Sequence, residues 1–362
     1  MADELLIYGS YGYTGSLVTQ TAVERGIAPV VAGRDSERVE SQAAALDLDH
    51  RVFSLEYPDV VESRVGDVTA VLNCAGPFTA TADPLVSACL ETGTDYLDIA
   101  GSIPVLEAIA ERDHGAEQAG VSLIPGVGFD VVPTDCLAAS LHNRLQSATR
   151  LTLALDGLDA GSPGTLKSVV EQLSRPGAVR ADGEIREVPV AWKRRRFDFG
   201  QGPKTAVTVP WGDISTAYYT TGIPNIGAYA TVPERAIRAM ELARPLVPLL
   251  GSRPVRRALS AAIDRTVSGP TAQERAGNVA RVWGAAETDD GERVVGRLET
   301  PDPYDLTALT AVAAATRTVE GEVEDAFQTP ASAFGADFVA EIEGVEREFE
   351  SAESADVPSA DV

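Results

Sequence analysis

The stretch Leu5-Leu6-Ile7-Tyr8-Gly9-Ser10-Tyr11-Gly12-Tyr13-Thr14-Gly15 decides the fold. Its apolar run Leu5–Tyr8 predicts a buried strand, and residues 16–23 predict the helix that follows. Three glycines spaced G-x-x-G-x-x-G lie between them, where glycine permits a positive φ and lets backbone approach a ligand closely. The helix N-terminus offers N–H groups and a positive dipole end to a phosphate. The turn therefore predicts a dinucleotide pyrophosphate site, and a glycine-rich turn without a ligand is the alternative. Its predicted contact residues are Gly9, Ser10, Tyr11, Gly12, Tyr13, Thr14 and Gly15.

The second strand candidate, residues 28–32, ends in Gly33-Arg34-Asp35-Ser36-Glu37-Arg38. In a dinucleotide fold the end of this strand meets the adenosine ribose, where a carboxylate would bind the 2′-hydroxyl of NAD. Here Gly33 leaves room and Arg34 suits a 2′-phosphate, with Ser36 and Arg38 as further contacts, so we predict NADP(H). Asp35 argues the other way, and the alternative is that both arginines are solvated surface charges.

Further strand candidates at residues 52–55, 70–73, 96–99 and 121–125 alternate with helical stretches. This alternation predicts an N-terminal Rossmann-type, doubly wound parallel sheet over residues 1–145. Ligands of such sheets bind at the carboxyl ends of the strands. We therefore expect two loops to line the nicotinamide pocket, residues 126–135 and the loop made of Asn73, Cys74, Ala75, Gly76 and Pro77.

Hydride transfer to a substrate also needs a proton donor, and no Tyr-x-x-x-Lys pair stands at the expected place. Asp130 and Tyr96 are the candidate catalytic residues, with bulk water as a third source. A hydrogen-bonding turn residue is the alternative for Asp130. Asp135, in the loop expected to line the nicotinamide pocket, precedes a helical stretch and could instead cap that helix.

Four motifs resemble the saccharopine dehydrogenase-like oxidoreductases: residues 9–15, 73–78, 88–98 and 128–135. The resemblance is greatest to the branch that includes the trans-acting enoyl reductases of mycobacterial lipid synthesis, and it continues at residues 164–168, 211–213 and 329–335. It implies an NADP-type nucleotide domain, a substrate domain, and a reductase role on lipid-like or acyl substrates. Gly101-Ser102 departs from the Gly-Glu that relatives often carry, which puts a carboxylate role at this position in doubt.

The second half predicts an α+β domain with a mixed sheet over residues 146–350, which would hold the substrate or form a dimer. Short strands are expected at residues 151–155, 188–190, 206–209 and 217–221, and a hairpin at residues 279–298 around Asp289-Asp290-Gly291. Helices are expected at residues 166–173, 234–250, 255–267, 306–319 and 338–349, the last packing back on the first domain. Residues 351–362 predict a disordered acidic tail.

One basic cluster, Trp192-Lys193-Arg194-Arg195-Arg196-Phe197, stands in an otherwise acidic chain. It could receive an anionic group, such as the phosphate of a carrier phosphopantetheine or of coenzyme A, or form a hairpin balanced by nearby acids. The apolar stretch at residues 245–251 could form a lip for a long substrate, touch a bilayer surface, or pack in the core or a homodimer.

The composition narrows the partners and the compartment. The 362 residues suffice for two domains, and 54 acidic against 30 basic residues give a formal net charge of −24 with only three lysines. This resembles proteins of salt-loving cytoplasm, with an ordinary acidic protein as the alternative. The acid-rich composition argues against nucleic acid as a partner, because binding to its phosphates needs many clustered Lys and Arg. Three cysteines without CxxC spacing predict neither disulfides nor a metal site. Without a signal peptide or an apolar run of about 20 residues, we expect a cytoplasmic protein.

Two functions from different classes follow. In the first, the protein is an NADPH-dependent enoyl or carbonyl reductase that acts on a small lipid-like or acyl molecule. In the second, it binds NADP(H) without turnover and senses the redox state. The second needs no catalytic acid, whereas the large second domain favours a substrate pocket.

Overall fold

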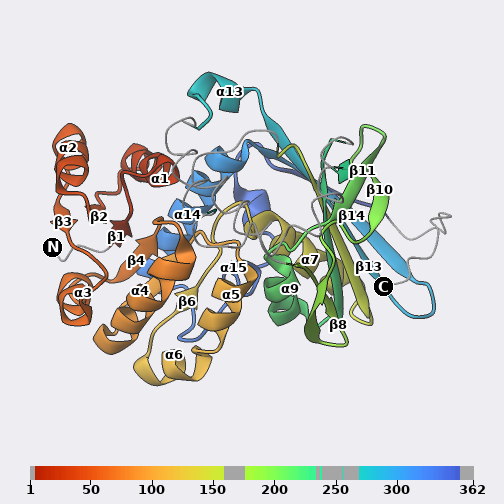
Figure 1. The fold of residues 1–362 in the computed structure, drawn as a ribbon, viewed down its shortest axis with the longest axis horizontal. Coiled ribbons are helices and arrows are strands. Elements are labelled where there is room, and N and C mark those ends of the chain that lie inside the picture. Colours follow the sequence, from red (N-terminus) through yellow and green to blue (C-terminus); the bar gives the residue numbers. More distant parts are fainter. Residues whose placement is uncertain (1–4, 159–175, 234–236, 239–254, 256–268, 351–362) are drawn as a thin grey trace. The chain divides into compact units, whose positions relative to one another are not determined.

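The computed structural model describes residues 5–158, 176–233, 237–238, 255 and 269–350. The chain divides into two compact units, Met1–Val132 with Pro303–Gly335, and Pro133–Asp302 with Ala336–Val362 (Figure 1). The chain therefore returns to the first unit after residue 302. The predicted division into residues 1–145 and 146–350 does not include this return. Several predicted features fall wholly or mostly outside the described residues: the helices at 166–173, 234–250 and 255–267, the apolar stretch 245–251, the motif at 164–168 and the acidic tail.

The first unit contains a six-stranded parallel sheet in the order β3-β2-β1-β4-β5-β6, which confirms the predicted doubly wound α/β fold. The chain leaves β1 toward one edge and later leaves β4 toward the other, so the topological switch point lies between these two strands. A ligand crevice is expected at their carboxyl ends. The strands are β1 (Leu5–Tyr8), β2 (Val30–Gly33), β3 (His50–Val52), β4 (Ala70–Asn73), β5 (Asp95–Asp98) and β6 (Leu123–Ile124).

Helices cover this sheet, and one of them comes from far along the chain (Figure 1). Helix α14 packs against α1, β4 and β5, and its Tyr304 ring meets the Tyr13 ring edge-on with centroids 4.9 Å apart. Between β5 and β6 the chain forms two helices, which are separated around Arg112. The helices are α1 (Tyr13–Glu24), α2 (Ser36–Leu46), α3 (Pro58–Val65), α4 (Phe78–Thr92), α5 (Ile103–Ala110), α6 (Asp113–Ala119), α14 (Pro303–Val319) and α15 (Pro330–Phe334).

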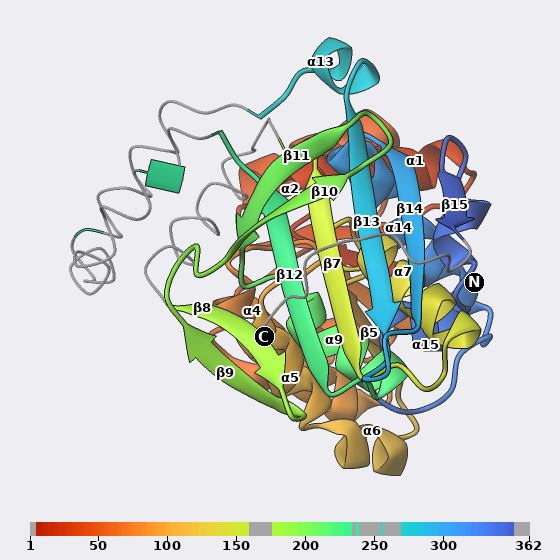
Figure 2. The same cartoon turned by 90° about the vertical axis from the view of Figure 1, so that its right-hand side faces the viewer.

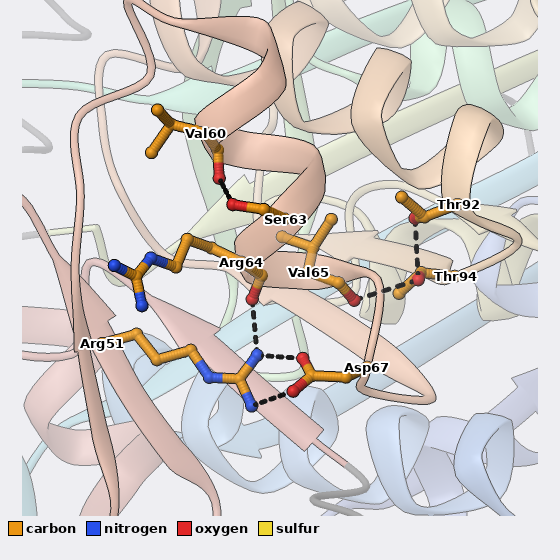
Figure 3. A network of polar contacts seen from close by, with 8 residues as sticks. All are labelled: Arg51, Val60, Ser63, Arg64, Val65, Asp67, Thr92 and Thr94. Atoms are coloured by element: carbon orange, nitrogen blue, oxygen red, sulfur yellow. Dashed lines mark hydrogen bonds and ion pairs between the residues drawn. The ribbon is translucent and has the colours of Figure 1, made fainter.

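Arg51 on β3 forms polar contacts at the C-terminal end of α3 (Figure 3). Its Nη1 donates to the carbonyl of Arg64 at 2.5 Å, and its guanidinium forms a two-point ion pair with Asp67. On the other side of the helix end, the Thr94 hydroxyl donates to the carbonyl of Val65 at 3.1 Å. These contacts satisfy two carbonyl groups that a helix end leaves without intrahelical partners.

We expect Arg51→Ala to lower the free energy of unfolding of the first unit by about 1 to 3 kcal/mol, because it removes charge-assisted hydrogen bonds from a side chain that is only 12% exposed. Urea unfolding followed by circular dichroism measures this loss. Arg64→Ala on the exposed surface of the same helix is the control and should change the free energy by less than about 0.5 kcal/mol. Equal losses in the two variants would contradict the role of Arg51.

The second unit is built on a nine-stranded mixed sheet, which agrees with the predicted α+β domain. Its main path runs β10-β11-β12-β7-β13-β14-β15, with β8 attached to β12 and β9 to β8; Figure 2 shows strands β10 to β14 face-on. Strands β13 and β14 form the predicted hairpin, in register from Val279↔Pro301 to Glu287↔Arg293. The strands are β7 (Arg150–Asp156), β8 (Gly177–Ala181), β9 (Glu184–Val188), β10 (Arg194–Asp198), β11 (Pro203–Thr208), β12 (Asn225–Thr231), β13 (Val279–Glu287), β14 (Arg293–Pro301) and β15 (Glu346–Glu350).

Helix α7 packs on this sheet through Leu137 and Leu141. A Cβ added at Gly284 of β13 would lie 2.9 Å from a methyl carbon of each leucine, so glycine permits the close approach. The described helices of this unit are α7 (Val132–Arg144), α9 (Asp213–Thr221), α13 (Ala272–Ala276) and the 3-10 turn η2 (Phe338–Glu341). In the parts of the chain that the structure describes, no helix is both long and apolar enough to cross a bilayer.

Three predicted elements of this unit are wrong. The strand expected at residues 188–190 lies earlier in the chain, since β9 ends at Val188. Residues 217–221 end helix α9 instead of forming a strand, because Gly222 stops the helix at φ 70° and the helix buries most of its residues, which overrides their β-propensity. Residues 338–349 are not one helix. Gly344, at φ 84°, lies between η2 and β15, and β15 pairs antiparallel with β14 within the second unit.

Candidate functional site

The turns after β1 and β4 meet at the switch point of the first sheet. Gly9, at φ 80°, donates its N–H to the carbonyl of Ala32 at 2.8 Å. A Cβ on Gly9 would lie 2.7 Å from the Cβ of Ala75, so only glycine fits between the two turns. The N–H of Cys74 donates to the carbonyl of Tyr8 at 2.8 Å. The structure therefore brings together two of the loops that the sequence places at the nucleotide site.

The other two glycines let helix α1 begin directly at the strand end. A Cβ on Gly15 would lie 2.2 Å from the carbonyl oxygen of Gly9, and one on Gly12 would lie 3.2 Å from the same oxygen. Among the described residues, no side chain caps the start of α1, and Gly12, Tyr13 and Thr14 are half-buried. A helix start that is reached through glycine backbone and lacks a side-chain cap fits a pyrophosphate.

Gly33 makes room for a protein side chain rather than for a phosphate. A Cβ at this position would lie 2.3 Å from Cε1 of Tyr11, so the tyrosine ring occupies that space. Arg38 lies over the same ring, with its Cζ 4.7 Å from the centroid, and Nη2 donates to the carbonyl of Tyr11 at 2.9 Å. Arg38 thus helps to hold the glycine turn, and its guanidinium is already engaged.

Arg34 is the cation that this region leaves available. It is exposed, and none of the described residues forms an ion pair or hydrogen bond with its guanidinium. Asp35, whose carboxylate could have indicated NAD, is instead the N-cap of α2, where Oδ1 accepts the N–H of Arg38 at 3.2 Å. Ser36 is exposed in the first turn of the same helix.

Several predicted contact residues have structural side chains. Ser10 is fully buried, and its hydroxyl donates to the carbonyl of Ala32 at 3.4 Å. The buried Asn73 amide donates to Thr81 Oγ1 at 3.2 Å and accepts the N–H of Ala75 at 2.9 Å, which fixes the turn after β4. The Cys74 thiol is also buried. Only the backbone of these residues can meet a ligand, whereas Ala75, Gly76 and Pro77 are partly or fully exposed.

Tyr96 belongs to the core, which corrects its assignment as a catalytic candidate. It has no exposed surface, its hydroxyl donates to Asp98 Oδ2 at 2.9 Å, and it accepts from the Asn73 amide at 3.1 Å. Burial raises the pKa of Tyr96 well above its ordinary value. The other carboxylate oxygen of Asp98 accepts the N–H groups of Ala100 and Gly126, each at 2.9 Å. Tyr96 therefore links the loops after β4, β5 and β6 and cannot reach a substrate.

The turn that carries Asp130 follows β6 and is anchored by helix α14. The N–H of Phe129 donates to Thr307 Oγ1 at 3.0 Å, and Thr310 Oγ1 donates to the carbonyl of Val127 at 2.8 Å. Reasoning from the sequence missed both threonines. The only signal for them was the spacing of two hydroxyls three residues apart, on one face of an alanine-rich helix.

Asp130 carries the one unpaired carboxylate of this turn. It is exposed, and none of the described residues forms a hydrogen bond or ion pair with it. A Cβ on Gly101 would lie 2.5 Å from the Cβ of Asp130 and 2.7 Å from Oδ2, so Gly101 provides the space for this side chain. Although solvent reaches the carboxyl, the protein atoms around it displace water and raise its pKa to about 6. Such a group can exchange a proton near neutrality.

Comparisons with known proteins agree with this geometry. Residues 5–124 match the family model described as saccharopine dehydrogenase NADP binding domain. A saccharopine dehydrogenase-like oxidoreductase of Rattus norvegicus is 27% identical over 216 residues, 52% of this chain and 50% of that protein. A trans-acting enoyl reductase of Mycobacterium leprae is 33% identical over 150 residues, 39% of this chain and 36% of that protein. The aligned regions thus span half or less of these relatives' own length.

The fold also has a solved counterpart. Apo saccharopine dehydrogenase (L-Glu forming) from Saccharomyces cerevisiae superposes with a TM-score of 0.66 at 12% identity, over 96% of this chain and 100% of that one. This likeness supports the α/β fold class. The family match confirms the predicted nicotinamide dinucleotide cofactor domain of the NADP type. Residues 5–124 of this chain are therefore similar to the saccharopine dehydrogenase NADP binding domain.

Proposed function

We propose that this protein is an NADPH-dependent reductase of a carbonyl group or conjugated double bond in a lipid-like or acyl substrate. The observation that carries the proposal is the position of two charged side chains, Arg34 and Asp130. They follow the carboxyl ends of β2 and β6 in one parallel sheet, and no described residue forms an ion pair or hydrogen bond with either side chain. The relative named trans-acting enoyl reductase supports the substrate class. The lipid-like substrate and the direction of hydride transfer rest on that relationship.

Each part of the site has a separate task. The backbone at Gly12, Tyr13 and Thr14 would hold the pyrophosphate, and Arg34 would pair with the 2′-phosphate. When bound, the cofactor supplies the hydride. Asp130 holds a proton at its carboxyl and delivers it to the substrate atom that gains negative charge during reduction. Thr307 and Thr310 position Asp130 by fixing its turn.

Arg34→Ala tests the cofactor assignment. We expect its dissociation constant for NADPH to rise roughly 10-fold to 100-fold, because a charge-assisted contact with the 2′-phosphate is worth about 1.5 to 3 kcal/mol. Its affinity for NADH, which lacks that phosphate, should stay within twofold. Arg25→Ala, at the far end of α1, is the control. Parallel losses for NADPH and NADH, or a wild-type preference for NADH, would refute the assignment of Arg34.

A non-catalytic NADP(H) sensor is the second candidate, and one observation favours it. Tyr96 is sealed in the core, so the first sheet offers no tyrosine hydroxyl at that position as a proton donor. The two functions differ in turnover. A sensor binds NADPH and oxidises none of it, whatever acyl or isoprenoid compound is added, whereas a reductase with Asp130 as its acid consumes NADPH.

A further inference from the structure

A recess on the sheet of the second unit belongs to none of the features described above. It is partly open to solvent, and it is lined by residues of β7, β8, β10, β12 and β13 and by the segment before β10. Three of its lining residues are cationic, Arg150, Lys193 and Arg195, although the chain as a whole has a net charge of −24. The basic cluster of the sequence thus contributes to a concave surface.

Two charged residues that line this recess, Arg150 and Glu287, form ion pairs, whereas Arg195 forms none with the described residues. Arg150 pairs with Asp289 at 2.9 Å, and Glu287, the acidic residue of the lining, pairs with Arg293 at 2.9 Å. Arg195 is half-buried and pairs with no described carboxylate. Its one described hydrogen bond, from Nη1 to the hydroxyl of Thr152, is long at 3.4 Å. A half-buried guanidinium in an acid-rich protein ordinarily acquires a carboxylate partner.

A second observation points to a missing anion. The positive charge of Arg195 reaches Arg293, where it adds to burial in lowering the pKa of that guanidinium. Arg195 and Arg293 therefore repel each other, and the nearby acids Glu287 and Glu350 compensate the charge of Arg293. An anion with several acceptor oxygens, placed against Arg195, would offset this repulsion and supply the negative partner that no described residue provides.

Aromatic rings border the same cation. The Cζ of Arg195 lies 5.4 Å from the ring centroid of Phe197 and 5.8 Å from that of Tyr229, and Tyr229 lines the recess. Trp192 also lines it, with the Lys193 ammonium 4.5 Å from the indole ring. These rings offer flat apolar surface beside the positive charge, which suits a ligand with an anionic end and an apolar or aromatic body.

We propose that this recess binds an organic phosphate ester, with Arg195 and Lys193 contacting the phosphate and Trp192 and Tyr229 contacting the body. A phosphate suits the site better than a carboxylate because it carries up to two charges and three free oxygens, enough for both cations. The residues are all in the second unit, separate from the nucleotide turn of the first. The proposal does not depend on the reaction catalysed.

Calorimetric titration of the full chain, saturated with NADPH so that the nucleotide site cannot compete, tests this assignment. The probes are phenyl phosphate, inorganic phosphate and benzoate in a chloride buffer. We expect phenyl phosphate to bind at least 10-fold more tightly than either of the others. Inorganic phosphate binding as tightly as phenyl phosphate would overturn the aromatic part of the proposal, and benzoate binding as tightly would overturn the choice of phosphate.

Variants assign the binding to this recess. Arg195→Ala should weaken phenyl phosphate at least 10-fold, and Lys193→Ala should weaken it several-fold, which provides a second test if Arg195→Ala does not fold. Arg196→Ala is the matched control, because this exposed neighbour lies on the opposite face of β10 and does not line the recess. No binding of phenyl phosphate to the wild type, or an equal loss in Arg196→Ala, would overturn the proposal.

Discussion

Asp130→Asn is expected to lower kcat for reduction by roughly 100-fold to 10,000-fold, the contribution typical of a positioned general acid. The amide keeps the shape of the side chain over Gly101 but cannot release a proton. The affinity for NADPH should stay within twofold, because Asp130 is assigned to the substrate rather than to the nucleotide. Steady-state kinetics together with nucleotide titration separate the two effects. Asp59→Asn, at an exposed position of α3, is the control.

The pH dependence follows from the raised pKa of Asp130, about 6. A proton donor is active in its protonated form, so kcat of the wild type should fall as the pH rises through about 6, and Asp130→Asn should lose this limb of the profile. A wild-type profile that is flat across this range, or an unchanged limb in Asp130→Asn, would contradict the role of Asp130.

The same pKa fixes the sign of the effect on stability. The folded-state pKa lies above the value near 4 of an unfolded aspartate. The protonated carboxyl of Asp130 therefore contributes its full stability below about pH 4, and this contribution is lost as the pH rises through about 6. At pH 7 the ionised carboxylate opposes folding, so Asp130→Asn should be at least as stable as the wild type there. A less active but no less stable variant is the signature of a functional group rather than a structural one.

Gly15→Ala is expected to weaken NADPH binding at least 100-fold and to destabilise the first unit. The added Cβ would lie 2.2 Å from the carbonyl oxygen of Gly9, a backbone atom that cannot rotate away, so α1 must move away from the strand end. That movement displaces the N–H groups that receive the pyrophosphate. Fluorescence titration with NADPH measures the loss.

Gly115→Ala provides the matched control for this change, since it also lies in a helix of the first unit and its added Cβ meets only a leucine methyl group at 3.9 Å. It should bind NADPH as the wild type does, with stability equal or higher by up to about 1 kcal/mol, because alanine is the better helix former. Wild-type affinity in Gly15→Ala would show that the glycine turn does not hold the nucleotide.

The first sheet could be predicted because its signals are local. At β1 the chain has an apolar run, then a glycine turn, then a helix. Strands and helices continue to alternate as far as β6. This local pattern was enough to predict the strands and the edge of the sheet at which a ligand would bind. The contacts that individual side chains make in the folded protein could not be predicted from the sequence. The neighbour of Gly33 is Tyr11, the partner of Asp35 is the backbone of its own helix, and the hydroxyl of Tyr96 points into the core.

The errors in the second unit have a different cause. Residues 217–221 carry β-prone tyrosines and threonines, yet they close a helix that begins at Asp213. Glu346–Glu350 is polar enough to suit a surface helix, yet pairing with the edge of β14 decides its conformation. Helix α14 was predicted as an element, but its return to the first unit depends on long-range packing, and this return supplies the two threonines that hold Asp130.

Oxidation of NADPH by an added acyl or isoprenoid compound distinguishes the reductase from the sensor. The full chain, saturated with NADPH in high salt, is mixed with a panel of enoyl and keto acyl thioesters and isoprenoid lipids, and the absorbance of the reduced nicotinamide is followed. We expect at least one compound to be reduced with stoichiometric loss of NADPH, and to be reduced more slowly when NADH replaces NADPH. Tight binding of NADPH without oxidation by any member of the panel would contradict the reductase and favour the sensor.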